Sequence, residues 1–116
     1  MTGLVFFGTS QLEETVAFYT EEVGMEVWLE QSECTILKFD NMLLGFCEHQ
    51  EAETEGTITF VSEDRDGVDA WYEQFADRAE DEPRVNEPFD IYNFFARDPE
   101  GRSIEFQTFL HPTDPV

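Results

Sequence analysis

The sequence predicts an α+β fold of two βαβββ modules in tandem, which together form a curved mixed sheet with helices on its convex side. The first observation is an internal repeat, in which aromatic residues recur at a constant spacing in the pairs Phe7 and Phe60, Phe18 and Trp71, and Tyr19 and Tyr72. The second is that each half reads as a strand, a helix and three strands. Neither half can bury its helix and its sheet face alone. We therefore expect one domain over residues 1–116, with modules at 4–50 and 57–109.

The first module begins with a short apolar strand at 4–8. Ser10 and Glu13 then have the spacing of a capping box, in which two side chains satisfy the first amides of a helix. Apolar residues recur at helical spacing up to Val23, and Gly24 suits the left-handed position that ends a helix. Residues 25–30, 35–39 and 43–48 read as the three strands.

The second module repeats this order. A strand at 57–62 precedes a helix that Asp64 or Asp66 can cap. Residues 79–88 read as an acidic loop with at most a short strand near Val85. Strands at 92–96 and 103–109 close the module around Asp98-Pro99-Glu100-Gly101, a turn in which proline fixes one φ angle and glycine supplies a positive one.

The composition is strongly acidic. The formal net charge is −21, from 27 acidic and 6 basic residues, and Lys38 is the one lysine. This balance resembles that of proteins from extreme halophiles, whose acidic surfaces stay hydrated in concentrated salt. It argues against nucleic-acid binding, because no basic patch is available for phosphates. No apolar run is long enough to span a membrane and no leader pattern begins the chain, so we expect a cytoplasmic protein.

Strand alternation predicts which side chains line the concave face. Residues of one parity are apolar and suit the helix-facing side: Val5, Phe7, Ile58, Phe60, Ile104 and Phe106. The other parity gives Leu4, Phe6, Thr57, Thr59, Glu105 and Gln107. If Asn41-Met42 forms the first hairpin turn, then Cys34 lies opposite His49 on this face, Ile36 opposite Cys47, and Lys38 opposite Gly45. The two cysteines do not make a secreted disulfide scaffold and can be small apolar fillers or, with His49, ligands of a soft metal.

The repeated module, the helix Leu12-Glu13-Glu14-Thr15-Val16-Ala17-Phe18-Tyr19 and the closing run Asp98-Pro99-Glu100-Gly101-Arg102-Ser103-Ile104-Glu105 together resemble the vicinal oxygen chelate superfamily. That group includes glyoxalases, dioxygenases and bleomycin-resistance proteins. The resemblance implies a divalent metal held by side chains at three positions, which fall here on Leu4, Thr57 and Glu105. Leucine cannot bind a metal and threonine is a poor ligand, whereas a catalytic metal wants about three protein ligands.

The sequence therefore favours a protein similar to the bleomycin-resistance members, which binds or sequesters a small molecule without a cofactor and forms a homodimer. The candidate ligand-binding residues are Phe6, Lys38, Cys47, Thr57, Thr59, Tyr92, Phe94, Glu105 and Gln107. The alternative is a divalent-metal-dependent lyase, isomerase or dioxygenase with Glu105 as the catalytic residue and a relocated ligand set of Glu105, His49 and Cys47. A third hypothesis is a non-catalytic module whose sheet edges pair with a partner.

Overall fold

The computed structural model describes residues 2–116, which form two compact units. Unit 1 contains the chain up to Thr54 together with Pro99–Gly101, and unit 2 contains Glu55–Asp98 and Arg102–Val116. Each unit has a four-stranded mixed sheet and one helical segment, in the order that the repeat predicts. The tandem α+β fold is therefore confirmed. No helix in this part of the chain is long and apolar enough to cross a membrane.

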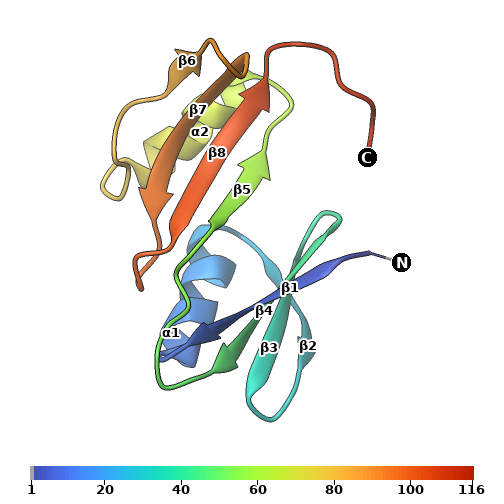
Figure 1. The fold of residues 1–116 in the computed structure, drawn as a ribbon, viewed down its shortest axis with the longest axis vertical. Helices are drawn as coiled ribbons and strands as arrows, with labels where there is room; N and C mark the ends of the chain where they lie inside the picture. The colour runs from blue at the N-terminus through green and yellow to red at the C-terminus, as the bar shows by residue number, and fades with distance from the viewer. Residues whose placement is uncertain (1) are drawn as a thin grey trace. The chain divides into compact units, whose positions relative to one another are not determined.

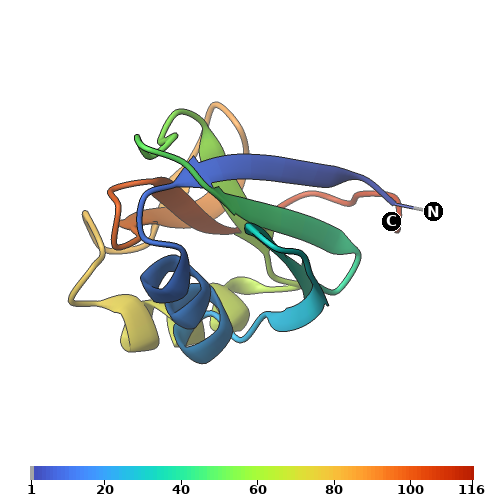
Figure 2. The same cartoon turned by 90° about the horizontal axis from the view of Figure 1, so that it is seen from below.

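Unit 1 is a sheet covered on one face by a helical segment (Figure 2). Its strands are β1 (Leu4–Thr9), β2 (Glu26–Glu30), β3 (Cys34–Phe39) and β4 (Met42–Glu48), and its helices are α1 (Leu12–Ala17) and the π-helix η1 (Phe18–Glu22). The strand order is β1-β4-β3-β2, with β1 parallel to β4. Tyr19 stacks on Phe46 at 5.0 Å, and both rings are buried. Gly24 has φ of +90° directly after this segment, as predicted.

The capping box predicted at Ser10 and Glu13 is wrong. Gln11 is the N-cap residue of α1, and its side chain makes no capping hydrogen bond. Glu100, which is distant in sequence, instead accepts hydrogen bonds from the Thr9 hydroxyl and from both the amide and the hydroxyl of Ser10. Its carboxylate therefore satisfies donors at the start of α1 that the sequence pattern assigned to a neighbour.

The register predicted for the first hairpin is also wrong, by two residues. The turn is at Asp40-Asn41, where Asp40 has φ of 49°, a conformation that two-residue hairpin turns require and that aspartate tolerates. Because the shift is of two residues, each side chain stays on its predicted face of the sheet, but its partner on the neighbouring strand changes. Cys34 lies opposite Cys47 and not opposite His49, and the two sulfur atoms form a disulfide.

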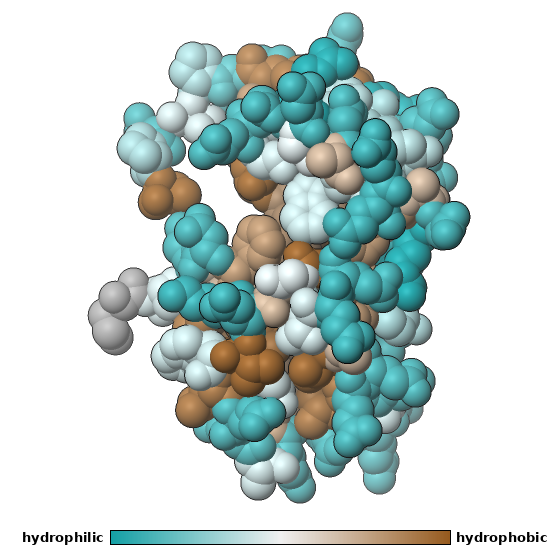
Figure 3. Space-filling view, turned by 180° about the vertical axis from the view of Figure 1, so that it is seen from behind, coloured by the Kyte–Doolittle hydropathy of each residue, from teal (hydrophilic) through white to brown (hydrophobic). Residues whose placement is uncertain are grey.

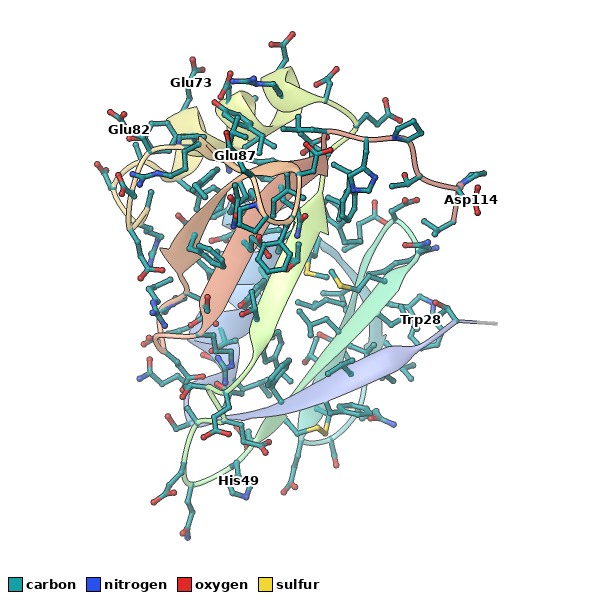
Figure 4. All side chains as sticks on the ribbon, turned by 45° about the horizontal axis from the view of Figure 1, so that its top comes forward. Trp28, His49, Glu73, Glu82, Glu87 and Asp114 are labelled. Atoms are coloured by element: carbon teal, nitrogen blue, oxygen red, sulfur yellow. A yellow bond between two sulfur atoms is a disulfide. The ribbon has the colours of Figure 1, made fainter. Side chains whose placement is uncertain are left out.

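Strand β2 contains a second irregularity. Val27 pairs with Leu37 and Leu29 with Ile36, which are adjacent residues of β3, so Trp28 lies in a bulge. Val27 and Leu29 therefore lie on opposite faces of the sheet, although simple alternation puts them on one. Trp28 projects from the strand and is 53% exposed (Figure 4).

Unit 2 repeats the arrangement with strands β5 (Thr57–Val61), β6 (Arg84–Asn86), β7 (Ile91–Arg97) and β8 (Ser103–Phe109) and helix α2 (Arg65–Phe75). The order is β5-β8-β7-β6, and α2 lies across one face (Figure 1). Asp64 caps α2 by accepting a hydrogen bond from the Gly67 amide at 2.9 Å. The predicted short strand near Val85 is present as β6.

Phe106 is the centre of the core of unit 2. Its ring lies 4.8 Å from that of Trp71 and 5.1 Å from those of Phe75 and Phe94, and Phe60 stacks on it from β5 at 5.6 Å. These contacts join β5, β7, β8 and α2. They fix which residues of β8 face the helix, so Glu105 and Gln107 face the other way.

Candidate functional site

The face of the unit 2 sheet away from α2 carries a pocket of about 380 Å³. Apolar side chains supply part of its wall: Phe89, Ile91, Phe95 and Phe109. The polar residues are Asn86, Asn93, Glu105 and Gln107. The pairing of β7 with β8 brings most of these apolar and polar side chains together, because Phe95 lies opposite Glu105, Asn93 opposite Gln107, and Ile91 opposite Phe109. The volume and the mixture of aromatic walls with few polar groups are typical of small-molecule sites.

Glu105 is the charged residue of this pocket, and it is 8% exposed. Its carboxylate oxygens each accept a hydrogen bond, one from the Thr59 hydroxyl at 2.8 Å and the other from the Asn93 side-chain amide at 2.7 Å. These donors come from the strands on either side of β8, so the sheet itself holds the carboxylate in place. A buried carboxylate needs such partners, because an unpaired one is costly to remove from water.

Gln107 contributes an unsatisfied acceptor. Its Oε1 atom is, among the buried side-chain nitrogen and oxygen atoms that the structure describes, the one found without a hydrogen-bond partner. Such an atom carries a desolvation cost unless a ligand or water supplies a donor. The residue lines the pocket beside Glu105. A ligand bound there can donate a hydrogen bond to Oε1 and so remove this desolvation cost.

A second hollow of about 640 Å³ adjoins the pocket and shares Asn86, Asn93 and Phe95 with it. Carboxylates dominate its rim: Glu80, Asp81, Glu82 and Glu87. Arg84 also lines this hollow, where it pairs with Asp81. The surroundings of the pocket are therefore predominantly negative.

The structure brings together three of the residues predicted for the site. Thr59, Glu105 and Gln107 lie on the pocket side of the sheet, with Thr59 bonded to Glu105. Thr57 has the same parity on β5 but pairs with Ser103, is exposed, and does not line the pocket.

Tyr92 and Phe94, which the sequence predicts as ligand-binding residues, face α2 instead. Phe94 stacks on Phe106, and the Tyr92 hydroxyl donates a hydrogen bond to Asp69 at 2.6 Å. The Arg65 guanidinium lies 4.2 Å from the centre of the Tyr92 ring. The hydrogen bond to Asp69 raises the pKa of Tyr92 above 10.0, and burial and the negative charge of Asp69 add to this effect, while Arg65 opposes it. The register of the β7–β8 hairpin decides that both side chains face α2, because Phe94 lies opposite the core residue Phe106 and Tyr92 has the same parity.

Phe6, Lys38 and Cys47 belong to unit 1. The Phe6 ring fills the space over Gly45, where a β-carbon would lie within 2.5 Å of two ring atoms. Lys38 is exposed opposite Leu43, and the sulfur of Cys47 is bonded to Cys34. None of the three lines the pocket over Glu105.

Sequence reasoning missed the aromatic walls and Asn93. A signal was available, because the turn at Asp98–Gly101 sets the pairing of β7 with β8. Counting back from Arg97 opposite Ser103 gives Phe95 opposite Glu105 and Asn93 opposite Gln107. No comparable signal existed for Phe89 or Asn86, which lie outside that ladder.

Known structures share this architecture, although no described protein family's sequence profile and no curated protein matches the chain. An integron cassette protein from the mobile metagenome of a Halifax Harbour sewage outfall superposes with a TM-score of 0.81 at 20% identity, over 94% of this chain and 98% of that one. A lactoylglutathione lyase from Agrobacterium tumefaciens gives 0.79 at 22% identity, over 93% and 92%. A glyoxalase/bleomycin resistance protein/dioxygenase family enzyme from Burkholderia phytofirmans PsJN gives 0.80 at 15% identity, over 92% and 97%.

The chain has the glyoxalase/bleomycin resistance/dioxygenase fold. The resemblance to the vicinal oxygen chelate superfamily is therefore confirmed at the level of the fold. At these identities the likeness carries no activity from those proteins to this one.

The side chains of this glyoxalase-like chain do not fit the metal centre that the fold implies. Leu4 has no ligating atom, Thr57 offers a neutral hydroxyl, and both oxygens of Glu105 already accept hydrogen bonds. Within residues 2–116 no group of three or more histidine, cysteine, aspartate or glutamate side chains is placed to hold a metal.

The relocated ligand set of Glu105, His49 and Cys47 is wrong. The disulfide removes the Cys47 thiolate that a soft metal needs. His49 extends from the end of β4, where it is exposed and its Nδ1 lies 3.0 Å from the Glu51 carbonyl (Figure 4).

Proposed function

We propose that this glyoxalase-like protein binds a small organic molecule in the pocket over Glu105, without a divalent metal as cofactor. The observation that carries the proposal is the buried Glu105 carboxylate, oriented by Thr59 and Asn93 at an aromatic-walled pocket. A fixed polar group beside exposed aromatic rings suits recognition of a ligand in one orientation. The mismatch of the metal positions disfavours the lyase and dioxygenase alternatives.

A fragment screen by ligand-observed NMR in concentrated KCl tests this proposal. Fragments should bind the wild-type protein and be lost in Phe95→Ala, because Phe95 forms part of the pocket wall and is 39% exposed. Leu110→Ala is the matched control, since Leu110 is an apolar residue, 37% exposed, that does not line the pocket. Binding that survives Phe95→Ala, or that both variants abolish, would contradict the assignment.

Elemental analysis of protein purified without a histidine tag separates the binding protein from a metalloenzyme. We expect a metal content far below one ion per chain, equal in wild type and Glu105→Gln. A stoichiometric divalent metal that Glu105→Gln removes would establish a metal centre and reverse the conclusion.

We also propose that the protein is a homodimer. Apolar side chains are exposed on β1 and β2 of unit 1: Val5, Phe6, Val27, Trp28 and Leu29. These strands are the two edges of the unit 1 sheet, and exposed apolar side chains at a sheet edge suit pairing with a second copy of the chain. Light scattering in concentrated KCl should give twice the chain mass, whereas a monomer would rule out the dimer and weigh against a partner-pairing module.

A further inference from the structure

The polar groups of the pocket over Glu105 are poised to accept hydrogen bonds. A carboxylate has about four lone-pair sites, and Glu105 uses two of them for Thr59 and Asn93. Gln107 adds a buried Oε1 atom without a donor. Among the residues that the structure describes, no lysine, arginine or histidine lines this pocket. A ligand that occupies these acceptor sites must therefore bring donors.

The walls favour a positively charged donor over a neutral one. Phe89, Phe95 and Phe109 line the pocket with exposed fractions of 69%, 39% and 41%. The face of an aromatic ring is negative and attracts cations within about 6 Å of its centre. A planar cation can lie against such a ring and still donate to the carboxylate, whereas a metal ion would require more oxygen ligands than Glu105 supplies.

The charge of the molecule acts in the same direction over a longer range. The chain has a formal net charge of −21, and the rim of the adjoining hollow carries Glu80, Glu82 and Glu87. A negative field raises the local concentration of cations and repels anions, to an extent that salt reduces.

We propose that the ligand is an amphipathic organic cation, with an amidinium, guanidinium or protonated amine that donates to Glu105 and Gln107 and a planar apolar body that packs on Phe95 and Phe109. The inference rests on the proposed function, because it names the ligand class of the same pocket. It explains why a buried carboxylate and an unpaired acceptor are placed side by side between aromatic walls.

Three probes with the same ring and different heads test the ligand class. Benzamidine is a cation that donates hydrogen bonds, benzamide is a neutral donor of nearly the same shape, and benzoate is an anion. Titrations of the full chain by NMR, at several KCl concentrations, should show benzamidine binding roughly tenfold more tightly than benzamide, as charge-assisted hydrogen bonds are about twice as strong as neutral ones. Benzoate should not bind, and the affinity for benzamidine should fall as the KCl concentration rises.

Glu105→Gln isolates the charge, because glutamine keeps the shape and still accepts from Thr59, while the Asn93 amide can rotate to present its oxygen. This variant should lose the preference for benzamidine, so that benzamidine and benzamide bind with about equal affinity. Phe95→Leu keeps an apolar wall but removes an aromatic ring. It should weaken the binding of benzamidine more than the binding of benzamide. Leu110→Ala should alter the binding of neither probe, and the thermal midpoint of each variant checks folding.

The outcomes separate the two proposals. If benzamide or benzoate binds as tightly as benzamidine or more tightly, the ligand is not a cation and this proposal is overturned. If Phe95→Ala abolishes that binding, the pocket still binds small molecules and the proposed function stands. A benzamidine preference that persists in Glu105→Gln would overturn the role of the carboxylate. If none of the probes binds, the cation class is rejected, and the fragment screen decides small-molecule binding separately.

Discussion

Buried polar residues determine much of what single substitutions should do to this protein. Asp98 and Arg102 are 3% and 1% exposed and are joined by a 3.1 Å ion pair. Asp98 also accepts a hydrogen bond from the Arg102 amide, so the turn that closes the β7–β8 hairpin depends on both residues. Removing one member of such a pair leaves a buried charge without its partner.

Arg102→Ala should therefore lower the free energy of unfolding by about 3–5 kcal/mol. The matched control is Arg97→Ala, because Arg97 pairs with Glu80 at 3.3 Å but both side chains are about half exposed. Arg97→Ala should lower the free energy of unfolding by less than about 1 kcal/mol. Urea unfolding in concentrated KCl measures both, and equal costs would contradict this account of burial.

Tyr92 gives the protein a pH dependence in the alkaline range. Its pKa is raised in the folded state by the hydrogen bond to Asp69, by burial and by the Asp69 charge. The folded state then holds its proton more tightly than the unfolded state, so the stabilisation is fully present below about pH 10.0 and is lost as pH rises through the folded pKa. Thermal midpoints of the wild type should fall over that window, and Tyr92→Phe should show a smaller fall. An unchanged fall would assign the alkaline loss to another group.

At the scale of elements, helix α1 depends on a residue far away in the sequence. Glu100 accepts hydrogen bonds from Thr9, Ser10 and Thr15, the last at 3.2 Å. Glu13 lies in the first turn of α1, but the local capping box is not formed. Stability should therefore respond to the distant carboxylate and not to the local one.

Glu100→Ala should cost about 1–3 kcal/mol, because it leaves several donors without their acceptor. Glu13→Ala should be nearly neutral in the same denaturation assay. The reverse order would show that the local capping box operates after all.

The β3–β4 hairpin has two independent supports. Its ladder of six residue pairs buries Leu37, Leu44 and Phe46, and the Cys34–Cys47 disulfide joins the strands across 13 positions. The ladder alone should keep the hairpin formed, with the disulfide adding stability mainly by restricting the unfolded chain.

Reduction with dithiothreitol should lower the free energy of unfolding by about 2–4 kcal/mol without loss of the far-ultraviolet circular dichroism signal. The Cys34→Ala/Cys47→Ala double variant should match the reduced protein and be insensitive to the reductant. A wild type that already has two reactive thiols before reduction would refute the disulfide.

The whole molecule is dominated by its charge. Hydrophilic side chains cover much of the face shown in Figure 3, and 27 acidic residues oppose 6 basic ones. Such a chain repels itself at low ionic strength, and at 0.1 M salt the repulsion between charges more than about 10 Å apart is largely screened.

The thermal midpoint should therefore rise steadily with KCl concentration. Sucrose at matched osmolarity is the control, because it favours compact states without screening charge. Equal effects of the two cosolutes, or no effect of KCl, would reject the expectation of salt adaptation.

The sequence by itself determined the order of the elements, the duplication of the module, the cap of α2 at Asp64 or Asp66, the closing turn and the position of Glu105 in the middle of a strand. These features depend on local periodicity and on turn chemistry, which a few adjacent residues encode. Tertiary structure decided the pairing of Cys34 with Cys47, the capping of α1 by Glu100, and the placing of Phe95 and Asn93, and not Tyr92 and Phe94, at the pocket. Each of these depends on register or on contacts between residues far apart in the chain. Local periodicity fixes neither, because a shift of one residue exchanges the faces of a strand and a shift of two exchanges its partners.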